Sequence, residues 1–139
     1  MPDRFEIEIQ APPAKVWAVL LDVERWPEWD PVVTAVKRLD PAPLSIGSRT
    51  QLQQPKLKPA VWEVTELDES SGVFTWTSRQ PGISTAASHK VEPTPTGSRV
   101  TLSLQFTGLL APLVASLLRK QNLEYIASEA QGLKAYCER

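Results

Sequence analysis

Cysteine and histidine are almost missing from this chain, whose 139 residues include one of each, Cys137 and His89. A lone cysteine excludes a disulfide within the chain and fits a reducing compartment. One histidine and one cysteine cannot build the usual zinc site, so we expect no bound metal. The glycine-rich loops that bind nucleotides and the nucleophile turn of serine hydrolases are also missing from the sequence. We therefore expect no cofactor.

A long apolar run and a strong net charge are missing as well. The longest apolar segment, 109–118, is interrupted by Pro112 and Ser116 and falls short of the roughly 18 residues that cross a bilayer. Segment 1–8 carries charges where a signal peptide needs apolar residues. The formal net charge of −1 gives no overall preference for nucleic acid or anionic lipid, although a sum near zero can hide local patches. We expect a soluble cytoplasmic protein without stable membrane insertion.

The residues that are present suit one compact domain over 1–139. Hydrophobic residues make up 42% and charged residues 22%, as is ordinary for a soluble globule. Phe5, Ile7 and Ile9 alternate with glutamates, which predicts a strand with one buried face. A helical apolar face at 16–20 follows a pair of prolines, and a second short helical turn begins near 24–26.

The middle of the chain has the β-branched or alternating pattern of strands. Turns rich in Ser, Gly and Pro at 68–72 and 93–97 join four of these segments into two hairpins. The segments are 32–39, 47–53, 60–67, 73–78, 85–92 and 98–106.

From Leu109 to Glu138 the apolar period becomes helical, and no proline follows Pro112. We expect one helix of about 27 residues and about 40 Å. Its predicted buried face carries Leu118, Asn122, Tyr125, Ile126, Glu129, Leu133 and Cys137.

This order of elements predicts an α+β fold. A curved antiparallel sheet of about seven strands would wrap around the long C-terminal helix, with two short helices after the first strand. The long helix needs a large surface for its apolar face, and a curved sheet is the one that remains. A sheet curled around a helix encloses a space of the kind in which small molecules bind.

The same order resembles the helix-grip fold of the polyketide cyclase/START-like superfamily, and two segments strengthen the resemblance. Segment 9–20 is similar to the family's opening strand and its helix with a proline and a Val-Trp pair. Segment 22–31 is similar to the family's Asp-x-x-x-Trp-Pro-x-Trp-x-Pro pattern. Weaker matches are Gly47, 62–66, 74–76, 95–101 and 133–138. The resemblance spans almost the whole chain and implies the fold. It leaves the function open, because the superfamily includes cyclases, lipid carriers and hormone receptors.

Five tryptophans are many for a chain of this length. Trp62 and Trp76 fall on neighbouring strands of one predicted hairpin, so their rings either wall a pocket or fill the core. Trp26 and Trp29 lie three residues apart on the short helical turn, where they form a lid or a mouth, and we place Trp29 at the rim. Trp17 is interpreted as a core residue.

Polar residues at inward positions are the other candidates. His89 shares strand parity with Val91, so it either acts as a general base in the pocket or forms a hydrogen bond without chemistry. The spacing shows no carboxylate partner for it. Asn122, Tyr125 and Glu129 lie on the buried helical face, where polar groups need partners. A cavity with water or a polar ligand would supply these, as would a strand. Glu129 is a second acid–base candidate.

Three functions remain open. The favoured one is binding of a hydrophobic small molecule, such as a lipid, a polyketide or an aromatic metabolite. The second is a cyclase or dehydratase that uses His89 as acid or base. The third is a protein-interaction domain that contacts its partner, which could be a second copy of the chain in a homodimer, through segment 109–118. The alternatives for this segment are a gate at the cavity entrance, a membrane contact, or packing on the first helices. The expected ligand-binding residues are Trp29, Trp62, Trp76, His89, Leu118, Asn122 and Tyr125.

Overall fold

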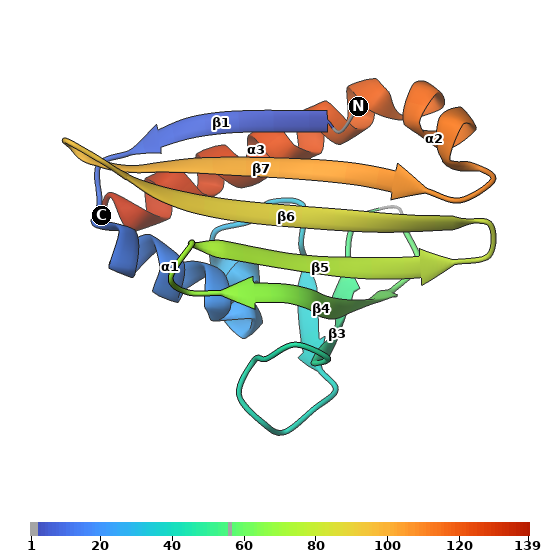
Figure 1. Ribbon diagram of the computed structural model, residues 1–139, viewed down its shortest axis with the longest axis horizontal. Coiled ribbons are helices and arrows are strands. Elements are labelled where there is room, and N and C mark those ends of the chain that lie inside the picture. Colours follow the sequence, from blue (N-terminus) through green and yellow to red (C-terminus); the bar gives the residue numbers. More distant parts are fainter. Residues whose placement is uncertain (1–2, 56) are drawn as a thin grey trace.

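The strands form one antiparallel sheet in the order β1-β7-β6-β5-β4-β3-β2. The computed structural model describes residues 3–55 and 57–139. Figure 1 shows the sheet with the C-terminal helix lying across one side of it. The strands are β1 (Asp3–Ile9), β2 (Ala35–Arg38), β3 (Arg49–Gln53), β4 (Ala60–Asp68), β5 (Val73–Gln80), β6 (Ile83–Thr94) and β7 (Gly97–Thr107).

Within the residues that the structure describes, four helical segments accompany the sheet. The first strand leads into α1 (Pro13–Leu21) and the 3-10 helix η1 (Val23–Glu28), and the last strand leads into α2 (Ala111–Leu117) and α3 (Arg119–Cys137). This arrangement confirms the predicted α+β helix-grip fold with its curved sheet of seven strands. None of the described helices is long and apolar enough to cross a membrane.

The prediction of a single C-terminal helix is wrong, because the helix breaks at Leu118 into α2 and α3. The backbone there has φ −105° and ψ 8°, outside the helical range, although Leu118 N–H still donates to the Val114 carbonyl at 2.9 Å. The start of α2 is tied to the β5–β6 turn, where Leu110 N–H donates to the Gly82 carbonyl at 2.9 Å. Since α3 packs along β1 instead, the two helices follow different surfaces.

The strand predicted at 32–39 is also shorter in the structure. Val32 N–H donates to Asp30 Oδ1 at 3.0 Å, and Val33 N–H donates to the Asp30 carbonyl at 3.2 Å. These bonds hold Val32 and Val33 in a turn, so β2 begins only at Ala35.

The core is solid at one end of the molecule. There α1 and η1 pack against the sheet and against the C-terminal half of α3, which buries Ala130, Leu133 and Cys137. The burial of Asn122, Ile126, Leu133 and Cys137 confirms most of the helical face that the sequence period predicted. The prediction of Leu118 on that face is wrong, because Leu118 lies at the break before α3 and is 39% exposed. The N-terminal half of α3 continues over a part of the sheet that this core does not reach.

Helix α3 touches the segment after η1 at Gly132. A Cβ atom placed on Gly132 would lie 2.0 Å from the Trp29 carbonyl oxygen, far inside a van der Waals contact. Only glycine therefore allows the helix to approach this backbone so closely. The contact fixes the height of α3 above the segment that carries Trp29 and Asp30.

Gly132→Ala tests this contact. Helix propensity alone would stabilise the alanine variant by about 1 kcal/mol. We expect the clash with backbone to outweigh that gain and to lower the free energy of unfolding by about 2 kcal/mol, as measured by urea denaturation. Gln131→Ala, at an exposed neighbouring position, should stay within about 0.5 kcal/mol of wild type. A Gly132→Ala variant more stable than wild type would contradict the close approach.

Candidate functional site

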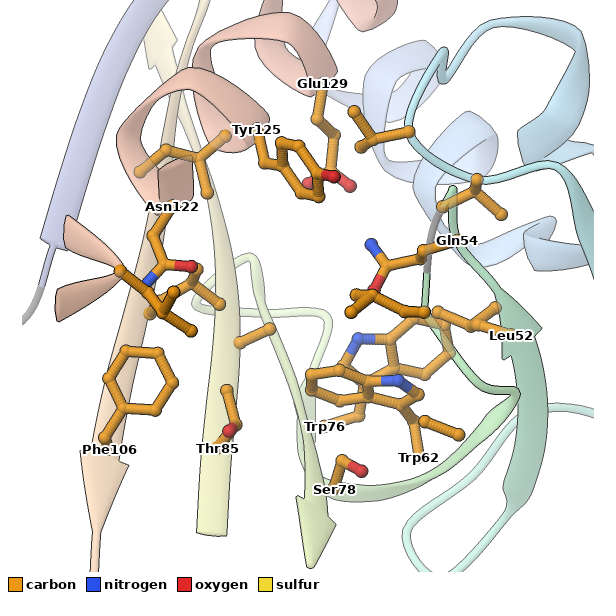
Figure 2. Close-up of a pocket in the computed structure, with 18 of the residues that line it drawn as sticks. Leu52, Gln54, Trp62, Trp76, Ser78, Thr85, Phe106, Asn122, Tyr125 and Glu129 are labelled. Atoms are coloured by element: carbon orange, nitrogen blue, oxygen red, sulfur yellow. The ribbon is translucent and has the colours of Figure 1, made fainter. Parts of the chain in front are cut away.

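A cavity of about 530 Å³ lies between the sheet and the N-terminal half of α3. Its volume falls within the range of about 300–1,000 Å³ that is typical of small-molecule sites. Strands β3 to β7 supply one wall and α3 supplies the other, with their side chains converging on the space between them (Figure 2).

The sheet wall is aromatic. Trp62 of β4 and Trp76 of β5 lie with ring centroids 6.0 Å apart, and Figure 2 shows the two indoles side by side at the cavity floor. Trp76 continues the cluster inward to Trp26, at 5.1 Å between centroids. These rings present a broad apolar surface that suits a flat ligand.

The helix wall is more polar. Asn122, Tyr125 and Glu129 follow one another at three- and four-residue steps, so they lie on one face of α3. Figure 2 shows all three side chains entering the cavity from above, opposite Trp62 and Trp76. A ligand held between the two walls would meet apolar rings on one side and hydrogen-bonding groups on the other.

The cavity opens at the end of the molecule where α2 meets α3. The cavity-lining residues that remain exposed mark this mouth, because the rest of the wall is buried or half-buried. They come from the β3–β4 connection, the end of β5 and the α2–α3 junction, and are Leu57, Lys58, Pro59, Gln80, Leu118 and Gln121.

His89 lies at the closed end with a defined proton arrangement. Its Nδ1 is 2.9 Å from the Phe74 carbonyl oxygen, and since a carbonyl only accepts, Nδ1 carries the proton and donates. In the neutral ring, Nε2 is then the free acceptor, and it faces Glu129 Oε2 at 3.6 Å. Burial lowers the pKa of His89 to about 4, so the ring is neutral at pH 7.

Asp30 completes this group, and sequence reasoning gave it no role. It is only 1% exposed, and its Oδ2 has no hydrogen-bond partner among the residues that the structure describes. Burial raises the pKa of Asp30, and the neighbouring Glu129 carboxylate raises that pKa further. The sequence marks Asp30 only by its position between Trp29 and Pro31 in the tryptophan-proline segment, and this position does not indicate that the side chain is buried.

Glu129 links Asp30 and His89 to the cavity. Burial raises the pKa of Glu129, as it does for Asp30. Two adjacent buried carboxyl groups that both resist ionisation share at least one proton at neutral pH. Glu129 lines the cavity and Asp30 does not, so only the Glu129 member of the pair faces a ligand. The cluster of Asp30, Glu129 and His89 can therefore donate a proton to a ligand or accept one from it.

Six of the seven expected ligand-binding residues line the cavity: Trp62, Trp76, His89, Leu118, Asn122 and Tyr125. Trp29 does not line it, and its expected place at the rim is corrected. Its ring is buried behind Trp26, at 5.2 Å between centroids. Trp26 reaches the cavity instead, while its Nε1 donates to the Leu20 carbonyl at 3.0 Å and holds it in the core.

No set of three or more His, Cys, Asp or Glu side chains within residues 3–55 and 57–139 could hold a metal ion. Cys137 is buried, and burial raises the pKa of its thiol to about 11.

Asp30→Asn tests the buried carboxyl pair through stability. Above pH 4 the unfolded chain releases the Asp30 proton while the folded chain keeps it, so wild-type stability should fall as the pH rises, by up to about 1.4 kcal/mol per pH unit from this group. The asparagine cannot ionise, yet it keeps an oxygen for the Val32 N–H. We expect the variant to gain stability over wild type progressively from pH 5 to pH 8 in urea denaturation.

Asp22→Asn, at an exposed position of the same region, is the matched control and should keep the wild-type pH slope. A stability difference between Asp30→Asn and wild type that does not change with pH would contradict a shared buried proton.

Comparison with known proteins agrees with this architecture. The family described as polyketide cyclase/dehydrase and lipid transport matches residues 4–138. No curated protein sequence matches the chain.

Solved structures share the fold at low sequence identity. A protein of Thermobifida fusca has a TM-score of 0.80 at 22% identity, over 96% of this chain and 90% of its own. A protein of Thermus thermophilus has a TM-score of 0.76 at 21% identity, over 97% of this chain and 95% of its own. The major latex-like protein 151 of Panax ginseng has a TM-score of 0.81 at 15% identity, over 100% and 98%. With a match from Arg4 to Glu138, the chain belongs to the polyketide cyclase/dehydrase and lipid transport family.

Proposed function

We propose that this protein binds a hydrophobic small molecule that carries one or more hydrogen-bond acceptors. The observation behind the proposal is the cavity of about 530 Å³ between two walls of different character. Protein interiors are normally close-packed, so a space of this size in a small domain indicates a ligand site.

Two buried donors in the walls favour an acceptor on the ligand. Trp62 Nε1 and Asn122 Nδ2 have no hydrogen-bond partner within the described part of the chain. A buried donor left unpaired costs about 1–3 kcal/mol, which an acceptor oxygen on a ligand would relieve. The ligand class that fits is a flat apolar body with carbonyl or hydroxyl groups. The family description names polyketides and lipids, and an aromatic polyketide has this chemistry.

Trp62→Ala tests the aromatic wall. Loss of the indole removes apolar contact and a donor, so we expect affinity to fall by about tenfold or more. Titration of purified protein with a panel of hydroxylated aromatics and fatty acids, followed by tryptophan fluorescence and native mass spectrometry, provides the measurement.

Val61→Ala is the matched control, because Val61 precedes Trp62 on β4 and is exposed on the outer face of the sheet. Its affinities should equal those of wild type. If no compound of the panel binds, or if Trp62→Ala binds the panel as tightly as wild type, the binding proposal fails.

A second candidate function is acid–base catalysis, and the cluster of Asp30, Glu129 and His89 favours it. An ionised Glu129 can remove a proton from the carbon next to a ligand carbonyl. In a β-hydroxy ketone, the electron pair then expels the β-hydroxyl group, and Glu129 returns the same proton to it, so that water leaves. The balance needs no oxidant or further reactant. His89 Nε2 and Asp30 would set the proton occupancy of Glu129.

Glu129→Gln tests this chemistry before a natural substrate is known. Ketones that bind in the panel are incubated with the protein in D₂O, and exchange of their α-hydrogens is followed by NMR. We expect exchange faster than in buffer for wild type and a loss of about 100-fold or more for Glu129→Gln, with binding retained. Glu124→Gln, exposed on the same helix, is the control. Equal exchange with Glu129→Gln and wild type would exclude this role for Glu129.

A further inference from the structure

The end of the molecule that holds the cavity mouth is free of acidic residues along three segments. The described residues of segments 54–60, 78–83 and 106–122 surround the mouth, and none of the 16 Asp and Glu residues of the chain falls within these segments. The overall charge of −1 therefore hides an asymmetry, because the acidic residues lie elsewhere while the mouth segments carry only basic, polar and apolar residues.

Exposed leucines gather on α2 and just before it, beside this mouth. Leu113 and Leu117 are 57% and 71% exposed, and their four-residue spacing places them on one outward face of α2. Leu109, two residues before the helix, is 95% exposed. Leu118 and Leu57, which are also exposed, line the mouth itself. Figure 1 shows α2 projecting at the end of the molecule, next to the β5–β6 turn. Exposed apolar side chains that gather in this way mark a contact site, unlike scattered ones.

Basic side chains border these leucines. Arg119 and Lys120 follow Leu117 and Leu118 directly, and Lys58 lies across the mouth, all of them exposed. Of the acidic residues next to these segments, Asp3 is buried and faces Arg119 at 4.0 Å, Glu63 pairs with Arg79 at 3.4 Å, and Glu124 is exposed one helical turn after Lys120. An apolar helical face bordered by cations is the pattern of helices that lie in the interface of an anionic membrane.

We propose that α2 and the cavity mouth form a docking surface for an anionic lipid bilayer. Leu109, Leu113 and Leu117 would enter the boundary between headgroups and acyl chains, while Lys58 and Lys120 contact anionic headgroups. The mouth would then open toward the bilayer, so that an apolar ligand could pass into the cavity without crossing water. This passage depends on the proposed binding function, whereas the docking itself does not.

Vesicle sedimentation tests the docking. Wild type should bind vesicles of 30% phosphatidylglycerol in phosphatidylcholine at low salt, and should bind pure phosphatidylcholine much more weakly. Each basic side chain near an anionic surface contributes about 1 kcal/mol, so Lys58→Gln/Lys120→Gln should lose about 30-fold in affinity. Leu113→Ser/Leu117→Ser should lose about tenfold or more, since two apolar side chains no longer enter the interface. Ile46→Ser is the matched control: Ile46 is 66% exposed and lies outside the mouth segments, and its loss should change nothing.

A fluorescent probe tests the orientation. A polarity-sensitive dye is attached at Leu113→Cys or, as a control, at Ile46→Cys. The native Cys137 is buried and holds its proton tightly, so the dye reacts at the introduced thiol. The emission of the dye at position 113 should shift to the blue when anionic vesicles are added, and that of the dye at position 46 should not.

Several results would overturn the proposal: no binding to anionic vesicles at low salt, equal binding by Leu113→Ser/Leu117→Ser and wild type, or a blue shift at both dye positions. A dimer in sedimentation velocity that Leu113→Ser/Leu117→Ser abolishes, without binding to vesicles, would assign the surface to self-association instead. The ligand panel in vesicle-free buffer keeps the two proposals apart, because the serine variant should bind these ligands as wild type does.

Discussion

The contact between Gly132 and the Trp29 carbonyl is the constraint on which the site depends. It sets α3 directly against the segment that follows η1. Asp30 comes directly after Trp29, and Glu129 lies one turn before Gly132 on the helix, so the two carboxyl groups become neighbours. The C-terminal half of α3 is then fixed in the solid core, so its N-terminal half must extend over the open part of the sheet. One short approach between two backbones thus positions both the acidic cluster and the roof of the cavity.

Much of the fold follows from sequence periods. Burial on one face of an element requires a local pattern of apolar residues. Two such patterns appear in the structure as predicted: the alternation at Phe5, Ile7 and Ile9, and the helical stripe from Asn122 to Cys137. The cavity walls follow from the same logic, because Trp62, Trp76 and His89 occupy inward positions of strands that the sequence identifies. The break at Leu118 does not follow, because it results from two packing surfaces that lie far from it in the chain.

The orientation of Trp26 and Trp29 and the assembly of the acidic cluster could not be predicted from the sequence. Side chains three residues apart in a 3-10 turn lie on the same side, so both Trp26 and Trp29 point inward and the first covers the second. Asp30, His89 and Glu129 come from a loop, a strand and a helix spread over 100 residues of chain. Tertiary packing brings these three side chains together, and it produces no regular residue spacing that the sequence could reveal.

The hydrogen bond from His89 Nδ1 to the Phe74 carbonyl has a consequence for ligand selection. It leaves only Nε2 to face Glu129, at 3.6 Å from Oε2. In the neutral ring this nitrogen can only accept a hydrogen bond. The closed end of the cavity therefore offers an acceptor beside a carboxyl group whose burial favours the neutral form, an arrangement that suits a hydroxyl group and disfavours an anion.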